Sequence, residues 1–187
     1  MSNIKPEPSI LLAGNSLRPM WGVAPRVFMT AAQWDRVRNA CYAKANFCCE
    51  ACGVPRHLAK PKPQLDCHEL YFFDFEEKFI TLKRLVALCK FCHDFIHKDR
   101  LAEMTRLGIY PSYYRDAVIA HGERILSAAG LPTVSESHPE VPPEDWDKWH
   151  YVDEKNERHY SNFLNDRHLT LHYAKENAKM LARKNRA

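Results

Sequence analysis

The sequence lacks any long hydrophobic run. No apolar stretch in its 187 residues approaches the roughly 18 to 20 residues that a membrane-spanning helix needs, so we expect no membrane partner. The first residues also lack the basic-then-apolar pattern of a secretory signal, which predicts a cytoplasmic protein. With 45% hydrophobic and 27% charged residues, the composition is typical of a globular fold and not of a disordered chain.

A strong net charge is also missing, because the formal value of +4 is too small to indicate a polyanionic partner. The distribution of charge is more informative. Residues 135–157 carry eight acids and two bases, whereas residues 167–187 carry six bases and one acid. This contrast favours separate roles or a basic tail that folds back, with solvated faces of opposite sign as the alternative. If the tail grips nucleic-acid phosphates, its candidate residues are Lys175, Lys179 and Arg183.

Composition divides the chain into four segments. Residues 1–29, with four of the prolines, predict an extended N-terminal arm, and residues 30–131 hold the main domain. Residues 132–145 are rich in proline and acids, which is typical of a linker. Two aromatic-rich runs and a basic stretch follow, so residues 146–187 predict a hairpin and then a helix over residues 166–185.

Three further helices are predicted from local signals. Thr30 and Gln33 fit a capping box at the start of a helix over residues 31–45. Residues 93–107 have a helical pattern that ends at a glycine. Residues 112–129 form the third candidate, with Gly130 placed where helices commonly end in a left-handed residue.

Two pairs of cysteines share the spacing C-x2-C, namely Cys49 with Cys52 and Cys89 with Cys92. Two intervening residues let a tight turn aim both sulfurs at one point, and two such knuckles supply the four thiolates of a tetrahedral Zn²⁺ site. Four cysteine ligands leave no position for a substrate, so the pattern predicts a structural zinc ion. Four unrelated buried thiols are the alternative.

The segment between the cysteine pairs is too long for a compact zinc ribbon. Its 36 residues exceed the roughly 15 to 20 found there. Residues 65–73 and 79–88 are rich in strand-forming side chains and flank an acidic turn. We therefore expect a hairpin whose base is held by the zinc site.

Three histidines accompany the second cysteine pair. His93 and His97 are four residues apart, so a helix beginning at this pair would place them one turn apart on one face. Such a pair commonly presents two imidazoles to one metal ion. His68 in the predicted hairpin would face them. The alternative is a set of surface histidines at the start of a helix.

This order of motifs resembles the zinc-knuckle branch of the HNH endonuclease superfamily over about residues 30–100. The resemblance implies an α+β fold with a small zinc-bound ββα-metal (treble-clef) core, flanking helices and, here, a C-terminal appendage. Such proteins are frequent in bacteria and their phages, so a phage-encoded form would act in the host cytoplasm. The motifs that carry the resemblance are Cys49-x2-Cys52-Gly53, Leu65-Asp66-Cys67-His68-Glu69 and Leu85-Val86-Ala87-Leu88-Cys89-x2-Cys92-His93-x3-His97.

The resemblance also implies roles for individual residues. His68 falls at the position of the general base, and His93 with His97 at the positions that hold a catalytic divalent ion such as Mg²⁺ or Mn²⁺. The four cysteines fall at the structural zinc. Phosphates of the nucleic acid, DNA rather than RNA, would then contact nearby cations. The candidates are Lys83, Lys90 and Arg100.

Two positions depart from the family pattern. Arg84 stands where the family has its middle asparagine, and we group it with His68 as a catalytic candidate because it could bind a flanking phosphate. Cys67 precedes the base where a metal-binding His or Asp is common, and a thiolate suits Mg²⁺ badly. Two functions therefore stay open: a nuclease, or a catalytically inactive zinc module. The latter would bind nucleic acid or, through the C-terminal region, a protein, as a phage inhibitor or adaptor does.

Overall fold

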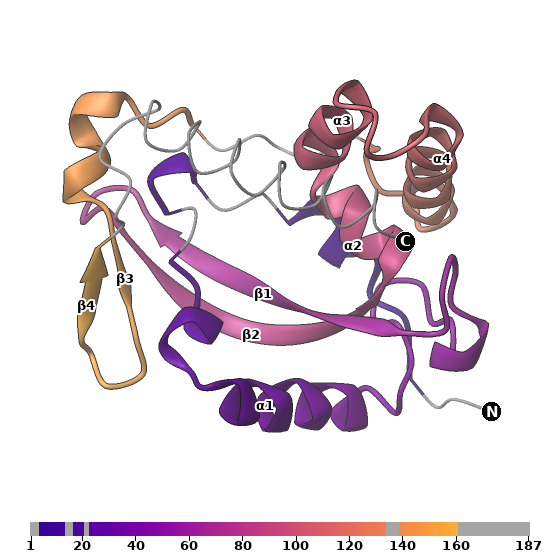
Figure 1. Cartoon of the computed structure of the whole chain (residues 1–187), viewed down its shortest axis with the longest axis horizontal. Helices are drawn as coiled ribbons and strands as arrows, with labels where there is room; N and C mark the ends of the chain where they lie inside the picture. Colours follow the sequence, from indigo (N-terminus) through magenta and orange to yellow (C-terminus); the bar gives the residue numbers. More distant parts are fainter. Residues whose placement is uncertain (1–3, 14–16, 21–22, 134–138, 161–187) are drawn as a thin grey trace. The chain divides into compact units, whose positions relative to one another are not determined.

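The computed structural model describes residues 4–13, 17–20, 23–133 and 139–160, and these residues form an α+β fold (Figure 1). Four helices and four strands follow in the order α1 (Ala31–Lys44), β1 (Leu65–Asp74), β2 (Phe79–Cys89), α2 (Lys90–Ile96), α3 (Lys98–Arg106), α4 (Ser112–Ala128), β3 (His150–Val152) and β4 (Arg158–Tyr160). The α+β class predicted from the sequence is confirmed. None of the described helices is long and apolar enough to cross a membrane.

The chain divides into two compact units. Of the described residues, unit 1 contains 4–13, 28–71 and 82–133, and unit 2 contains 17–20, 23–27, 72–81 and 139–160. The β1–β2 hairpin contributes residues to both units, since its base belongs to unit 1 and its tip to unit 2.

Unit 1 is built around the base of the hairpin. The buried core brings Cys41 and Tyr42 of α1 together with Val86 and Leu88 of β2. Helices α2, α3 and α4 pack against one another and form a group beyond the end of β2 (Figure 1). The junction of β2 and α2 is part of this core. The candidate site lies at this junction.

The predicted helices are found with one difference. The capping box of α1 is present, because Gln33 N–H donates to the Thr30 hydroxyl and the Gln33 side chain accepts from Thr30 N–H. Helix α4 ends as expected, with Gly130 at a φ of +67°. The single helix expected over residues 93–107 is wrong, because the backbone leaves the helical region at His97 and divides it into α2 and α3.

Unit 2 contains a short sheet at the hairpin tip. Strand β3 pairs in parallel with Phe79–Thr81 of β2, and β4 pairs antiparallel with β3. The hairpin expected after residue 146 is thus confirmed as β3 and β4. The helix expected over residues 166–185 lies outside the described residues, and so do Lys175, Lys179 and Arg183.

The described part of the N-terminal arm, residues 4–13, 17–20 and 23–29, is less extended than the prolines suggest. Short 3₁₀ turns occupy Pro8–Leu12, Arg18–Met20 and Pro25–Phe28. Ile10 and Leu11 are only 3% and 1% exposed and belong to the core of unit 1. Burial of these aliphatic side chains stabilises the packing of this part of the arm in the core of unit 1.

Candidate metal centres

The first cysteine pair lies in a tight turn after α1. The backbone N–H of Cys49 donates to the carbonyl of Val54 at 2.9 Å, and the N–H of Gly53 donates back to the carbonyl of Cys49 at 2.8 Å. Gly53 has a φ of +76°, which glycine adopts without strain. A Cβ there would also lie 2.9 Å from Pro6. Glycine therefore permits both the turn and the close approach of the N-terminal arm.

The second cysteine pair lies at the junction of β2 and α2. Cys89 is the last residue of β2 and the N-cap of α2, and Cys92 lies in the first turn of that helix. A chain that changes from strand to helix here turns both sulfurs to one side. Cys89 and Cys92 are 2% and 0% exposed, so their sulfurs are sealed from solvent.

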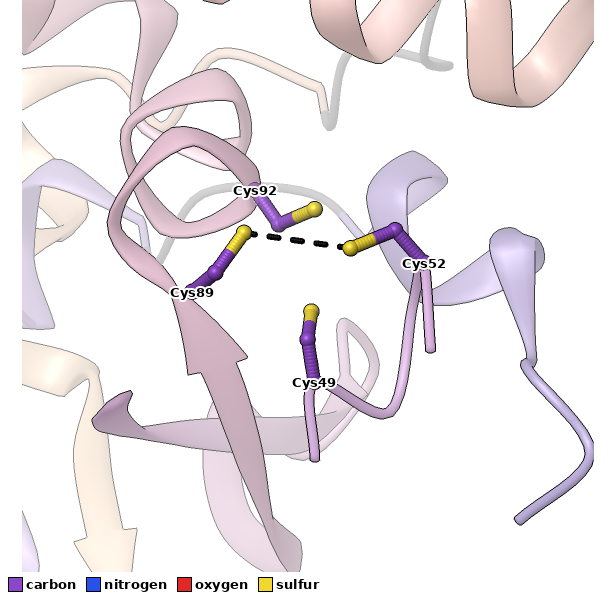
Figure 2. A group of neighbouring side chains, drawn as sticks. All are labelled: Cys49, Cys52, Cys89 and Cys92. Carbon is purple, nitrogen blue, oxygen red and sulfur yellow. Dashed lines mark hydrogen bonds between the residues drawn. The ribbon is translucent and has the colours of Figure 1, made fainter. Parts of the chain in front are cut away.

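The four sulfurs converge on one point (Figure 2). Each sulfur lies within 4.8 Å of the other three, and the sulfurs of Cys52 and Cys89 are 3.9 Å apart. Tetrahedral zinc with Zn–S bonds of about 2.3 Å requires sulfurs roughly 3.8 Å apart. The donor set and its spacing therefore fit a zinc ion, as the C-x2-C pairs predict.

The crowding of the sulfurs changes their ionisation. Hydrogen bonds from Cys49, Cys89 and Cys92 lower the pKa of the Cys52 thiol far below its ordinary value. Interaction with the sulfurs of Cys49 and Cys52 raises the pKa of Cys89, because a second thiolate beside the first is disfavoured. A bound cation would offset the repulsion between neighbouring thiolates and so stabilise all four in the anionic form.

A network of hydrogen bonds ties the first cysteine turn to β2. Glu50 N–H donates to the carbonyl of Ala87 at 2.8 Å, and a Glu50 carboxylate oxygen accepts the N–H of Ala87 at 2.8 Å. The other carboxylate oxygen accepts from Arg84 at 2.8 Å, and Arg84 also donates to Glu7 at 2.6 Å. The structure thus places Arg84 between the N-terminal arm and the first cysteine turn.

The second cluster consists of three imidazoles, from β1 (His68), from α2 (His93) and from the junction of α2 and α3 (His97). One ring nitrogen from each of His68, His93 and His97 lies within 4.8 Å of those of the other two. The ring centroids are 4.8 to 5.2 Å apart and the rings meet edge to face. His68 is 6% exposed and the other two are half-buried. The structure therefore brings together the three histidines that the sequence analysis singled out.

Burial favours the metal-binding, neutral form of one ring in this cluster, that of His97. Desolvation, together with the nearby rings of His93 and His68, lowers the pKa of His97 well below its ordinary value. A neutral imidazole has a lone pair on one nitrogen, so it can accept a metal ion. Three such donors are a common set for a divalent transition metal and leave further coordination positions open.

Asp66 lies behind the histidine cluster. One of its carboxylate oxygens is 3.0 Å from Nδ1 of His93, at an angle that is not that of a hydrogen bond, and this buried nitrogen has no hydrogen-bond partner among the described residues. Burial opposes ionisation of Asp66, but the His93 ring, Lys90 and Arg100 outweigh it and lower the pKa of the carboxyl. Asp66 therefore carries a negative charge that can orient the His93 ring when a metal binds the other nitrogen.

The predicted phosphate-binding cations have different surroundings. Lys90 pairs with Asp94, whose other oxygen accepts from the Tyr114 hydroxyl at 2.7 Å. Arg100 is exposed, and its positive charge acts on His97 and Asp66. Among the described carboxylates, none lies within ion-pair distance of Arg100. Lys83 is exposed on β2.

Cys67 does not join the histidine cluster. Successive side chains of a strand point to opposite faces, so Cys67 and His68 diverge. A hydrogen bond from the Cys67 thiol lowers the pKa of Cys41 on α1. Cys67 and Cys41 are each 8% exposed, so both belong to the core. Cys67, which precedes His68, is therefore a packing residue of the core.

Two residues near the metal centres were not expected from the sequence. His121 on α4 lies 3.5 Å from the sulfur of Cys92, although 28 residues separate the two along the chain. Glu50 joins the cysteine turn to β2. The only sequence signal for His121 is a polar residue within the apolar stripe of α4, and spacing alone does not connect that stripe to a cysteine.

Another set of potential ligands occurs in unit 2. Asp153, Glu157 and His159 bring ligand atoms within 4.8 Å of one another. Asp153 already accepts the backbone N–H groups of Lys155 and Glu157, and its second oxygen lies 2.9 Å from His159. These contacts account for the geometry of the β3–β4 turn without an ion.

Comparison with other proteins gives no information about the two metal centres. Searches against family models, curated proteins and solved structures returned no match.

Proposed function

We propose that the chain is a metal-dependent endonuclease of the HNH type, with a structural zinc ion at the four cysteines and a catalytic divalent ion at the histidines. The observation that carries the proposal is the convergence of His68, His93 and His97, whose ring nitrogens lie within 4.8 Å of one another. The succession of a hairpin, a cysteine pair and a helix supports a treble-clef core of the ββα-metal type.

The electrostatics of the histidine cluster favour an anionic substrate. Three neutral imidazoles do not cancel the charge of a divalent ion, so a loaded centre would keep a net positive charge even with the Asp66 carboxylate beside His93. Arg100 adds a cation without an ion-pair partner among the described residues, and Lys90 adds a second one that is paired with Asp94. Such a site attracts a phosphate group, in agreement with a nucleic-acid backbone as substrate.

The proposed reaction is hydrolysis of a phosphodiester. His68 accepts a proton from a water molecule, the water oxygen bonds to phosphorus, and the P–O3′ bond breaks. The leaving oxygen takes up a proton, so the products are a phosphomonoester and an alcohol with no change of oxidation state. His93 and His97 would hold a divalent ion, which would polarise the phosphate and stabilise the leaving oxygen. Arg100 holds the flanking phosphate.

Plasmid nicking tests the proposal. Zinc-loaded protein is incubated with supercoiled DNA in Mg²⁺, Mn²⁺, Ni²⁺ or no added metal, beside His68→Ala and the matched control His57→Ala, whose side chain is exposed. We expect nicking only with metal, a loss of at least about a hundredfold in His68→Ala, and wild-type activity in His57→Ala. Nicking without metal, or a fully active His68→Ala, contradicts the proposal.

A second candidate function is a zinc module without catalysis. The observation that favours it is the position of Arg84, which pairs with Glu7 and Glu50 and so leaves the family's middle asparagine without a substitute of like chemistry. Absence of nicking in every metal, with zinc retained and DNA bound in a gel-shift assay, would support this function over hydrolysis.

A further inference from the structure

Helix α4 reaches the cysteine cluster through His121. Its Nε2 lies 3.5 Å from the sulfur of Cys92, and its ring meets Phe91 edge to face at a centroid distance of 5.4 Å. Phe91 lies between the two cysteines of the second pair, so His121 contacts both a side chain of that turn and one of its sulfurs. The contact is thus part of the cluster's immediate surroundings.

The close approach of α4 depends on its glycine. A Cβ at Gly122 would lie 2.2 Å from the ring of Phe95 on α2, a distance that no side chain tolerates. Gly122 is itself buried. Its missing side chain allows α4 to pack directly on α2, and this packing places the adjacent His121 against Cys92.

The second ring nitrogen of His121 determines which nitrogen carries the proton. Nδ1 of His121 lies 3.3 Å from a guanidinium nitrogen of Arg124. A guanidinium can only donate hydrogen bonds, so Nδ1 is the acceptor. In a neutral imidazole the proton is then on Nε2, which is the nitrogen that faces the sulfur of Cys92. The geometry is that of an N–H···S hydrogen bond.

We propose that His121 is a positioning residue of the cysteine metal centre, whose Nε2–H donates to the Cys92 thiolate and thereby increases metal retention. Four thiolates around Zn²⁺ carry a net charge of −2, and a hydrogen bond to one sulfur spreads part of that charge. The same bond fixes the side-chain rotamer of Cys92 before metal binds. Neighbours of this kind typically change metal affinity by about 10- to 100-fold.

The inference gives α4 a role in the metal centre that the cysteine spacing does not reveal. It requires only the four cysteines and α4, and it holds whether or not the histidine cluster is catalytic. Metal affinity and thiolate spectroscopy therefore test it separately from DNA nicking.

The test compares His121→Ala, which removes the donor, with His121→Gln, whose amide nitrogen can still donate to the sulfur. Zinc affinity is measured by competition with a chromophoric chelator. Cobalt-loaded protein gives the energy of the sulfur-to-metal charge-transfer band. We expect His121→Ala to weaken zinc binding about 10- to 100-fold and to shift the band to lower energy, because an unbonded thiolate is a stronger electron donor. His121→Gln should restore most of both effects.

The control is His57→Ala, which removes an exposed histidine of the same unit and should change neither measurement. Unchanged affinity and an unchanged band in His121→Ala overturn the proposal. Equal losses in His121→Ala and His121→Gln overturn it too, since they indicate a packing role only. If His121→Ala fails to fold, His121→Asn, which keeps a polar side chain but is too short to reach the sulfur, must show the same band shift, and its absence overturns the proposal.

Discussion

The cysteine cluster, from the turn after α1 and the junction of β2 and α2, offers four sulfurs that become anionic around a metal, whereas the neighbouring histidine cluster offers three imidazole nitrogens. With a divalent ion, the cysteine centre would carry a net charge of −2 and the histidine centre a net charge of +2. The first set is complete for tetrahedral zinc, and the second leaves at least one position free. The two clusters therefore differ in the sign of their net charge and in the number of free coordination positions.

The surroundings of the two clusters differ in the same sense. The cysteine turn is tied to β2 by one backbone and one side-chain hydrogen bond between Glu50 and Ala87, and it is approached by Pro6 of the arm. The histidine cluster instead has an exposed cation, Arg100, and a buried ring nitrogen of His93 without a hydrogen-bond partner among the described residues. Saturated contacts favour a structural role, and unsatisfied groups favour ligand binding.

Under the proposed function, this difference makes the cysteine centre a support for the histidine centre. Cys92 and His93 are consecutive residues of α2, and His97 is the C-cap of the same helix, so whatever fixes the sulfur also fixes the helix that presents the two imidazoles. Reactive groups need a rigid frame to hold productive geometry. The predictions below test this division of labour by substituting residues in and around each cluster.

The largest effect is expected from Cys89→Ser. Binding of structural zinc contributes about 10 to 16 kcal/mol of folding free energy in small zinc domains, so loss of one ligand should abolish the cooperative melting of unit 1. Circular dichroism during heating and the zinc content of the purified protein measure the change. The matched control is Cys48→Ser, which replaces a buried cysteine outside the cluster. Equal melting temperatures of Cys89→Ser and wild type would contradict the structural role.

A smaller loss is expected from Gly122→Ala, which disturbs the packing of α4 on α2. The added Cβ collides with Phe95, and overpacking of this kind costs about 1 to 3 kcal/mol. Unfolding in urea measures the loss. Phe95→Leu in the same chain should recover part of it by making room for the methyl group. A double variant that is less stable than the sum of the two single variants would show that the collision is not the cause.

Arg84 tests the link between the arm and the cysteine turn. Its ion pairs with Glu7 and Glu50 are partly exposed, so Arg84→Met should lower the free energy of unfolding by about 1 kcal/mol or less, and high salt should reduce the difference. Arg115→Met, at an exposed pair with Asp116, is the control and should change stability by less than about 0.5 kcal/mol. A fall in DNA nicking far beyond the loss of stability would give Arg84 a direct catalytic role.

Local patterns predicted much of the candidate site. The two residues between the cysteines of each pair, the three residues between His93 and His97, and the Thr30 capping box all act within about one turn of the backbone, so their geometry follows from the sequence itself. The four sulfurs do converge and the three histidines do meet. The predicted helix over residues 93–107 was nevertheless wrong at His97.

Contacts between distant segments could not be predicted in the same way. His121 contacts Cys92 because Gly122 allows α4 to pack closely on α2. Arg84 contacts Glu50 because hydrogen bonds hold the first cysteine turn beside β2. Neither arrangement follows from residue spacing, because packing of separate elements decides it. A single sequence gives the periodicity of each element but not the surface against which the element packs.

A small effect on folding, and the sharpest contrast with Cys89→Ser, is expected from His93→Ala. The substitution removes a half-buried ring that lies 3.0 Å from an oxygen of the partly exposed Asp66 and meets the rings of His68 and His97 edge to face, so the free energy of unfolding without a second metal should fall by no more than about 1 kcal/mol. Binding of a second ion should nevertheless disappear, because only one of its two proposed ligands, His97, remains. Calorimetric titration of zinc-loaded protein with Ni²⁺, which imidazole ligands suit, measures this binding, with His57→Ala as the control. A ligand of the histidine centre should be required for Ni²⁺ binding but not for folding. Retained Ni²⁺ binding in His93→Ala, or unfolding as severe as in Cys89→Ser, would therefore contradict the division into a supporting centre and a reactive one.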